Sequence, residues 1–171
     1  VMDATNNRID VNFHRTTKNK HLIVIDPGHG GKDSGAIRGS VVEKKIVLSV
    51  GTFLKEELSK DFNVVMTRDS DVFVVLSQRP KMANKSNAKL FVSIHANASE
   101  SKNANGVEVF YFSKKSSPYA ERIANFENTI GEQYGDSSDK IIQISGELAY
   151  KKNQENSIRL ARKIAENISS G

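Results

Sequence analysis

The amino-acid sequence predicts an α/β fold, with a mostly parallel, twisted sheet and helices on both of its faces, in a single domain. Short apolar runs alternate along the chain with longer segments whose apolar residues recur every three to four positions. This strand-helix-strand order repeats, which requires crossover connections and therefore favours parallel strands. With 171 residues, of which 37% are hydrophobic and 26% charged, the chain is long enough for one domain with a core.

The first segment differs from the rest of the chain. Residues 1–20 are polar, rich in Asn and Lys and without sustained periodicity, which is typical of a tail or linker, with a short strand expected at 9–13. The domain is expected to span 21–171. It begins with "HLIVID" (residues 21–26), an apolar run that ends before Pro27 and is typical of a central strand buried on both faces.

The following elements continue the alternation. Residues 43–60 carry apolar side chains on one helical face, and "FNVVMTR" (residues 62–68) predicts the second strand. A short helix is expected at 77–84. Pro80 is compatible with it, because it falls in the first turn, where proline is tolerated. The run "KLFVSIH" (residues 89–95) predicts the third strand.

The last third of the chain predicts one more strand and two helices. We expect a fourth strand at "GVEVFYF" (residues 106–112). Ser117 and Pro118 suit the cap and the first position of a helix that continues to about residue 130. Apolar residues on one side predict the final helix at 147–168.

Composition and charge exclude several classes of function. The chain has no cysteine, so a metal would be held by His, Asp or Glu. No apolar run approaches the roughly 20 residues of a membrane span, and the N-terminus lacks the apolar core of a signal peptide. The net charge of +5 favours an anionic partner. Because the Lys and Arg residues are scattered with few aromatic residues between them, we expect no nucleic-acid partner.

The glycine-rich stretch "VIDPGHGGKDSGA" (residues 24–36) indicates where the functional site lies. His29 follows the carboxyl end of the first predicted strand, and His95 ends the third. Carboxyl ends of parallel strands share one edge of a sheet, where functional groups collect. Glu43 opens the helix after the glycine-rich loop, which can bring its carboxylate near His29. Two imidazoles and one carboxylate suit a catalytic Zn²⁺ that keeps a fourth position for water.

Each of these residues also has a structural interpretation. Glu43 could serve the helix N-terminus through its charge, and the glycines could be turn residues only. The loop lacks the spacing of both glycine-rich nucleotide-binding motifs, so no nucleotide site is expected. His14 and His21 lie in or beside the tail at the opposite end of the sheet, and we expect both to be structural or solvated.

Six motifs along the chain resemble those of one enzyme family. In order they are "IDPGHGGKDSGA", "VEKKIVL", "TRDSD", "RPKMAN", "LFVSIHAN" and "GVEVFYF", within about residues 21–168. Together they resemble the zinc-dependent N-acetylmuramoyl-L-alanine amidases of the periplasmic cell-division type. The resemblance implies that His29, Glu43 and His95 hold one zinc ion per chain. It further implies a periplasmic location and, as substrate, the amide between N-acetylmuramic acid and L-alanine in peptidoglycan.

The implied reaction is metal-assisted amide hydrolysis, in which the departing amine needs a proton. In the family, a Glu in a strand near the C-terminal end of the domain supplies it. No such strand follows Ile168 before the chain ends in "SSG". The catalytic acid/base therefore stays unknown, and we expect a domain truncated before its last strand that binds zinc but hydrolyses little peptidoglycan.

The long connection at 113–146 is expected to be a regulatory insertion, because long ordered connections often act as lids. In the resembling amidases, a helix in this region lends a Glu to the zinc until an activator protein withdraws it. The matching residue is Glu127 in "NFENTIG", with Glu121 or Glu132 in its place if the register slips by a turn. The alternative is that Glu127 is one solvated acid on an exposed helix.

Three further side chains are candidates for substrate contacts. Asn97 lies two residues beyond His95 and would point to the same side of an extended strand, where it could touch the substrate or the ligands, although we favour its being a turn residue. Arg68 and Arg79 could bind carboxylates of the substrate. We favour their pairing with the nearby Asp69 or Asp71, and expect Arg79 chiefly to stabilise the fold.

Two other functions stay open. The chain could be a peptidoglycan-binding module whose metal is not catalytic, or another metallohydrolase with the same His/Glu/His set, such as a deacetylase. The product separates the enzymes, because a deacetylase releases acetate and an amidase releases peptide.

Overall fold

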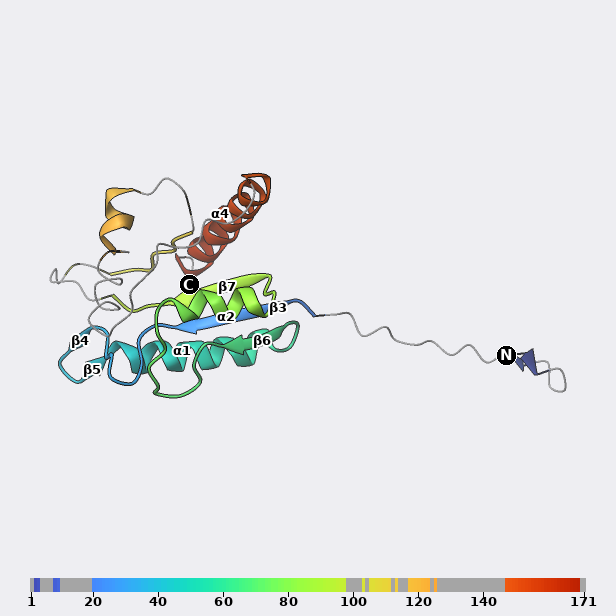
Figure 1. Ribbon diagram of the computed structural model, residues 1–171, viewed down its shortest axis with the longest axis horizontal. Coiled ribbons are helices and arrows are strands. Elements are labelled where there is room, and N and C mark those ends of the chain that lie inside the picture. Colours follow the sequence, from blue (N-terminus) through green and yellow to red (C-terminus); the bar gives the residue numbers. More distant parts are fainter. Residues whose placement is uncertain are drawn as a thin grey trace.

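A three-stranded parallel sheet with the strand order β6-β3-β7 lies at the centre of the molecule (Figure 1). The middle strand is β3 (Leu22–Pro27), flanked by β6 (Asn63–Met66) and β7 (Leu90–Ile94), and both neighbours run parallel to it. This computed structural model confirms the parallel α/β architecture and the central place predicted for the first apolar run. It describes residues 20–97, 105–111, 117–123 and 147–169, and also 2–3, 8–9, 103, 113 and 125.

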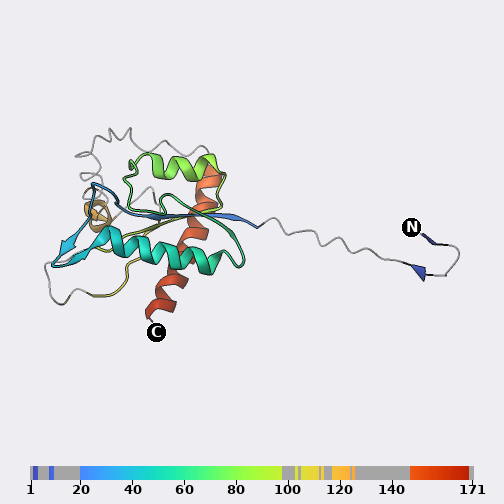
Figure 2. The same cartoon turned by 90° about the horizontal axis from the view of Figure 1, so that it is seen from below.

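Helices cover both faces of the sheet, as predicted. Figure 2 shows α1 (Glu43–Leu58) and α2 (Gln78–Lys85) on opposite sides of it. Pro80 is the third residue of α2, within the first turn, where its missing N–H leaves no helical hydrogen bond unmade. The helix α4 (Glu147–Ser169) lies beyond the β7 side of the sheet and matches the predicted final helix (Figure 1).

The core lies between β3 and α1. Ile23 and Ile25 are buried with Met66, and the strand register places Ile25 opposite Met66 and Val92. Gly51 of α1 faces this core, and a Cβ built there would lie 2.9 Å from Cγ of Pro27. The helix therefore approaches the sheet more closely than a side chain at this position would allow.

The structure contains two small antiparallel pairs. β1 (Met2–Asp3) pairs with β2 (Arg8–Ile9), so the strand expected at 9–13 is present at Ile9, while 10–13 lie outside the described residues. β4 (Ile37–Arg38) pairs with β5 (Val41–Val42) across a turn that was not predicted. Gly39 in that turn has a φ of +62°, a conformation that glycine adopts without strain.

The predicted fourth strand is wrong for the residues that the structure describes. Residues 107–111 belong to no strand, and Val107, Phe110 and Tyr111 are exposed. A strand forms only where its backbone exchanges hydrogen bonds with a neighbour, and residues 107–111 do not pair with β7. Apolar alternation in this segment therefore did not suffice to add it to the sheet.

The predicted helix cap at Ser117 is confirmed. Residues 118–123 are helical, and the amide of Ala120 donates to Oγ of Ser117 at 3.1 Å. The expected end of this helix near residue 130 lies outside the described residues. None of the helices in the described ranges is long and apolar enough to cross a membrane.

Candidate metal centre

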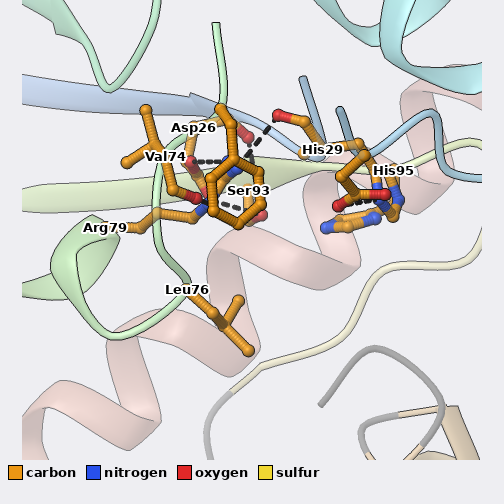
Figure 3. Close-up of a pocket in the computed structure, with 10 residues that line it drawn as sticks. Asp26, His29, Val74, Leu76, Arg79, Ser93 and His95 are labelled. Atoms are coloured by element: carbon orange, nitrogen blue, oxygen red, sulfur yellow. Dashed lines mark hydrogen bonds and ion pairs between the residues drawn. The ribbon is translucent and has the colours of Figure 1, made fainter. Parts of the chain in front are cut away.

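His29, Glu43 and His95 come together at the carboxyl end of the sheet. His29 follows β3, His95 follows β7, and Glu43 is the first residue of α1. Each offers one ligand atom, and these atoms all lie within 4.8 Å of one another. Oε1 of Glu43 lies 3.2 Å from Nε2 of His29 and 3.3 Å from Nδ1 of His95. The two imidazole rings meet nearly at right angles, with centroids 4.9 Å apart (Figure 3).

The glycine-rich loop makes room for these imidazoles. A Cβ at Gly28 would lie 2.4 Å from Cε1 of His95, and one at Gly35 would lie 2.5 Å from Cδ2 of His29. Real Cβ atoms do not approach that closely, so both positions require glycine. The sequence left open whether these glycines only form turns, and the contacts show that they also admit the histidine side chains.

Glu43 is buried and anchored by the backbone. Its Oε2 accepts a hydrogen bond from the amide of Ala36 and its Oε1 one from the amide of Ala96, both at 2.8 Å. Burial acts to raise the pKa of Glu43, but hydrogen bonds from His29, His95 and the two amides outweigh it and hold the pKa well below its usual range. The carboxylate is therefore ionised and directed at the imidazoles.

His29 is oriented by Asp33, a residue that the sequence analysis did not single out. Nδ1 of His29 lies 3.0 Å from Oδ2 of Asp33, whose Oδ1 accepts the amide of Gly35 at 3.0 Å. With Nδ1–H donating to Asp33, the ring presents Nε2 to Glu43. The spacing of four residues after the histidine, within a tight loop, was the signal that could have identified Asp33.

The pKa of His29 is raised to about 9 in this environment. Burial alone would lower it, but the hydrogen bonds to Asp33 and Glu43 and their negative charges outweigh burial. Burial likewise acts to raise the pKa of Asp33, and the hydrogen bond from His29 lowers it instead. Both pKa shifts favour an ion pair between a charged His29 ring and the neighbouring carboxylates.

The donor set fits a zinc ion. Two imidazole nitrogens and one carboxylate oxygen, without thiolates, are ligands of catalytic zinc sites. Tetrahedral ligands with bonds of about 2.0–2.1 Å lie about 3.3 Å apart. The two separations that involve Glu43, 3.2 and 3.3 Å, match that spacing.

A cavity of about 50 Å³ opens beside the two histidines (Figure 3). Its lining includes the polar residues Asp26, Asp33, Arg79 and Ser93 and the apolar residues Phe73, Val74 and Leu76. A space of this size admits a small group or water next to the imidazoles.

The partner of Arg79 differs from the one predicted. Nη1 of Arg79 pairs with Oδ1 of Asp26 at 2.9 Å, and both side chains are buried. Asp71, one of the expected partners, instead accepts hydrogen bonds from Lys44 Nζ at 2.7 Å and from the Gly31 amide at 2.8 Å. The expectation was wrong because α2 directs Arg79 toward the end of β3.

None of the remaining sequence candidates that the structure describes belongs to the group of three. Asn97 is exposed and lies three residues beyond the end of β7. Glu121 is exposed on the helix 118–123 and does not join the group, while Glu127 and Glu132 lie outside the described residues. His21 is exposed, as expected, and His14 is not among the described residues.

Comparison with known proteins identifies relatives of this chain. Residues 23–171 match the family model Amidase_3, described as N-acetylmuramoyl-L-alanine amidase. The N-acetylmuramoyl-L-alanine amidase AmiC of Escherichia coli O6:H1 is 42% identical over 112 residues, which are 63% of this chain and 27% of that protein. The match therefore spans little more than a quarter of that relative.

Two solved structures are similar to this one. The N-acetylmuramoyl-L-alanine amidase AmiC2 of Nostoc punctiforme has 44% identity and a TM-score of 0.52, over 61% of this chain and 59% of its own. The CwlD amidase from Clostridioides difficile, solved in complex with the GerS lipoprotein, has 28% identity and a TM-score of 0.50, over 71% and 70%.

Proposed function

Since the chain belongs to the Amidase_3 family of N-acetylmuramoyl-L-alanine amidases, we propose that it hydrolyses the amide between N-acetylmuramic acid and L-alanine in peptidoglycan with one bound zinc ion. The observation that carries this proposal is the convergence of His29, Glu43 and His95, whose ligand atoms lie within 4.8 Å of one another. It implies peptidoglycan as partner and a location where peptidoglycan is accessible, namely the periplasm or cell envelope.

The three residues would hold the metal through His29 Nε2, a carboxylate oxygen of Glu43 and a ring nitrogen of His95. Bound zinc supplies a Lewis acid for the amide carbonyl and an activated water. The chain's own contribution is orientation, because Asp33 fixes the His29 ring and two backbone amides fix Glu43. These contacts hold the ligands in place before a metal arrives.

Protonation of the departing amine needs a separate acid. Glu43 and Asp33 are unsuited, because the pKa of each is lowered and both accept hydrogen bonds. The family resemblance assigns this role to a Glu in a strand that follows the last helix. We propose the same division of roles here, with Asn97 as a contact to the substrate.

A metal and product assay tests the function. Wild-type protein is expected to bind one zinc per chain, and His29→Ala and His95→Ala are expected to lose it, with His21→Ala as the control at an exposed histidine. Stoichiometric zinc in both site variants contradicts the proposal. A chain extended through the strand expected after the last helix should release free stem peptides from purified sacculi, whereas residues 1–171 alone are expected to release little. Release of acetate instead indicates a deacetylase, and sedimentation with sacculi without any product indicates a binding module.

We further propose that the insertion at 113–146 inhibits the site, with Glu127 as a fourth ligand until a partner protein withdraws it. A carboxylate in the fourth position would displace the water that hydrolysis needs. The complex of the CwlD amidase with a lipoprotein supports control by a protein partner. In a chain extended through the expected last strand, Glu127→Ala is expected to raise hydrolysis without a partner, and Glu121→Ala, at an exposed position, to leave it unchanged. Equal rates in the two variants contradict inhibition by Glu127.

A further inference from the structure

Two buried arginines hold the loop that carries His29. Arg68 donates from Nε to the carbonyl of Pro27 at 3.0 Å and from Nη2 to that of Gly28 at 2.7 Å. Arg79 donates from Nη1 to the carbonyl of Pro27 and from Nη2 to that of His29, both at 2.9 Å. Three successive carbonyls at the end of β3 are therefore held by two guanidinium groups.

These contacts fix the backbone on both sides of His29. The Gly28 carbonyl lies in the peptide plane that precedes the Cα of His29. The His29 carbonyl lies in the peptide plane that follows that Cα. Holding both planes sets φ and ψ of His29 together. This residue has a φ of +58°, a left-handed conformation that non-glycine residues keep only where their surroundings impose it.

Arg68 also connects the two ligand-bearing segments. Its Nη2 donates to the carbonyl of Lys44 at 2.9 Å, in the first turn of α1 and next to Glu43. The amide of Gly28 in turn donates to the carbonyl of Ile94, next to His95, at 3.0 Å. Through its N–H and its carbonyl, the backbone of Gly28 thus connects the segments of all three candidate ligands.

The hydrogen bonds of Arg68 indicate that it holds the backbone around the candidate ligands in position. Its side chain is buried, and its four hydrogen bonds all go to backbone carbonyls, those of Pro27, Gly28, Lys44 and Ser70. Burying the Arg68 guanidinium beside that of Arg79 opposes folding, because the two charges repel and both lose hydration. Hydrophobic packing alone therefore does not explain why Arg68 is buried. The planar fork of five N–H donors does explain it, because no other side chain spans several carbonyls in fixed directions.

We propose that Arg68 and Arg79 are positioning residues of the metal centre, which set the orientation of His29 and its distance from Glu43 before the metal binds. This inference rests on the proposed function, because it presumes that the three residues hold a metal. It extends the role expected for Arg79 from stabilising the fold to shaping the site.

Arg68→Lys is the decisive variant, because it keeps the charge and removes the fork. Its zinc Kd, measured by competition with a chromophoric chelator, is expected to rise about 10- to 100-fold, as when other residues that orient metal ligands are replaced. Arg79→Lys is expected to act in the same direction. The matched control is Ala83→Gly, which lowers stability from a buried position of α2 without touching a loop carbonyl, and its zinc Kd is expected to stay at the wild-type value.

A spectroscopic readout separates positioning from general destabilisation. The visible absorption bands of the Co²⁺-loaded protein report ligand geometry, and they are expected to change in Arg68→Lys and to remain unchanged in Ala83→Gly. A zinc Kd and Co²⁺ spectrum of Arg68→Lys equal to those of wild type overturn the inference, while the metal centre itself stands. If wild type and Ala83→Gly bind no zinc, the proposed metal centre fails and the inference with it.

A measurement on the wild-type protein covers the case in which Arg68→Lys does not fold. If the hydrogen bonds of the two arginines favour metal binding, bound metal must stabilise those hydrogen bonds in return. The Nε–H protons of Arg68 and Arg79 are therefore expected to exchange with solvent more slowly when zinc is bound. Exchange rates that zinc leaves unchanged, in protein shown to bind it, overturn the inference.

Discussion

The apolar side chains in the first half of β3 and the polar side chains at its end and in the following loop are both buried, but different interactions hold them. Ile23, Val24 and Ile25 have exposed fractions of 0–6% and contact other apolar residues. Asp26, His29 and Asp33 have exposed fractions of 3–7%, and each is held by charged or hydrogen-bonding partners. Apolar packing tolerates substitutions of similar volume, whereas a buried polar group requires its particular partner. Substitutions in the two regions should therefore fail in different ways.

The largest loss of stability is expected in the polar region, from Arg79→Met. The variant leaves the buried carboxylate of Asp26 without its cation, although Thr67 and Ser93 still donate to it. Removing one partner of a buried ion pair costs about 3–5 kcal/mol of unfolding free energy. Urea denaturation measures this, with Asp69→Ala, at an exposed acid, as a control expected to be neutral. A loss equal to that of the control would show that the pair contributes nothing.

In the apolar region, Ile25→Ala is expected to lower the free energy of unfolding by about 2–5 kcal/mol, because it removes a fully buried side chain and leaves a cavity. The zinc Kd of the folded variant should stay near that of wild type, since Ile25 contacts the core and none of the three candidate ligands. Ile25→Val, which removes one methylene, is the graded control. A large loss of zinc affinity in Ile25→Ala would mean that the two regions are not independent.

In the polar region, Gly28→Ala is expected to have the opposite effect, with a larger change in zinc binding than in stability. A methyl group at this position would overlap the ring of His95, and such overpacking costs about 1–3 kcal/mol. Zinc binding is expected to fall far more than stability, because the displaced side chain is a candidate ligand. Gly39→Ala is the control in which a Cβ meets nothing within 4 Å, although its positive φ adds some strain. Unchanged zinc affinity in Gly28→Ala would contradict the role assigned to this close contact.

The last effect concerns pH, in protein from which metal has been removed with EDTA. The pKa of His29 is raised from 6.5 to about 9, so its charged form contributes stability that is complete below pH 6.5 and is lost as the pH rises through 9. The lowered pKa values of Glu43 and Asp33 keep both carboxylates ionised throughout this window. In EDTA, the midpoint of unfolding is therefore expected to decrease as the pH is raised from 6.5 to 9. In Asp33→Asn this decrease with pH is expected to be smaller. A midpoint that rises over this range would contradict the assignment.

Local patterns predicted most of the framework. The apolar run at 22–27, the helical periodicity after Glu43 and the run that ends before His95 each depend on residues close in sequence, and the structure has the corresponding elements. Once the strands were expected to be parallel, their carboxyl ends had to share one edge, so the meeting of His29, Glu43 and His95 followed from the sequence as well.

Partners of buried polar groups, in contrast, were decided only by the tertiary structure. Arg79 pairs with Asp26, 53 residues away, rather than with the acids nearest in sequence. The run at 106–112 predicted a strand that the described residues do not form, because a strand also needs hydrogen bonds to a neighbouring strand, and residues 106–111 pair with none. Periodicity is a property of neighbouring residues and can be recognised in a sequence. The pairing of buried charges and of strand edges depends on which distant segments folding brings together, and no local pattern records it.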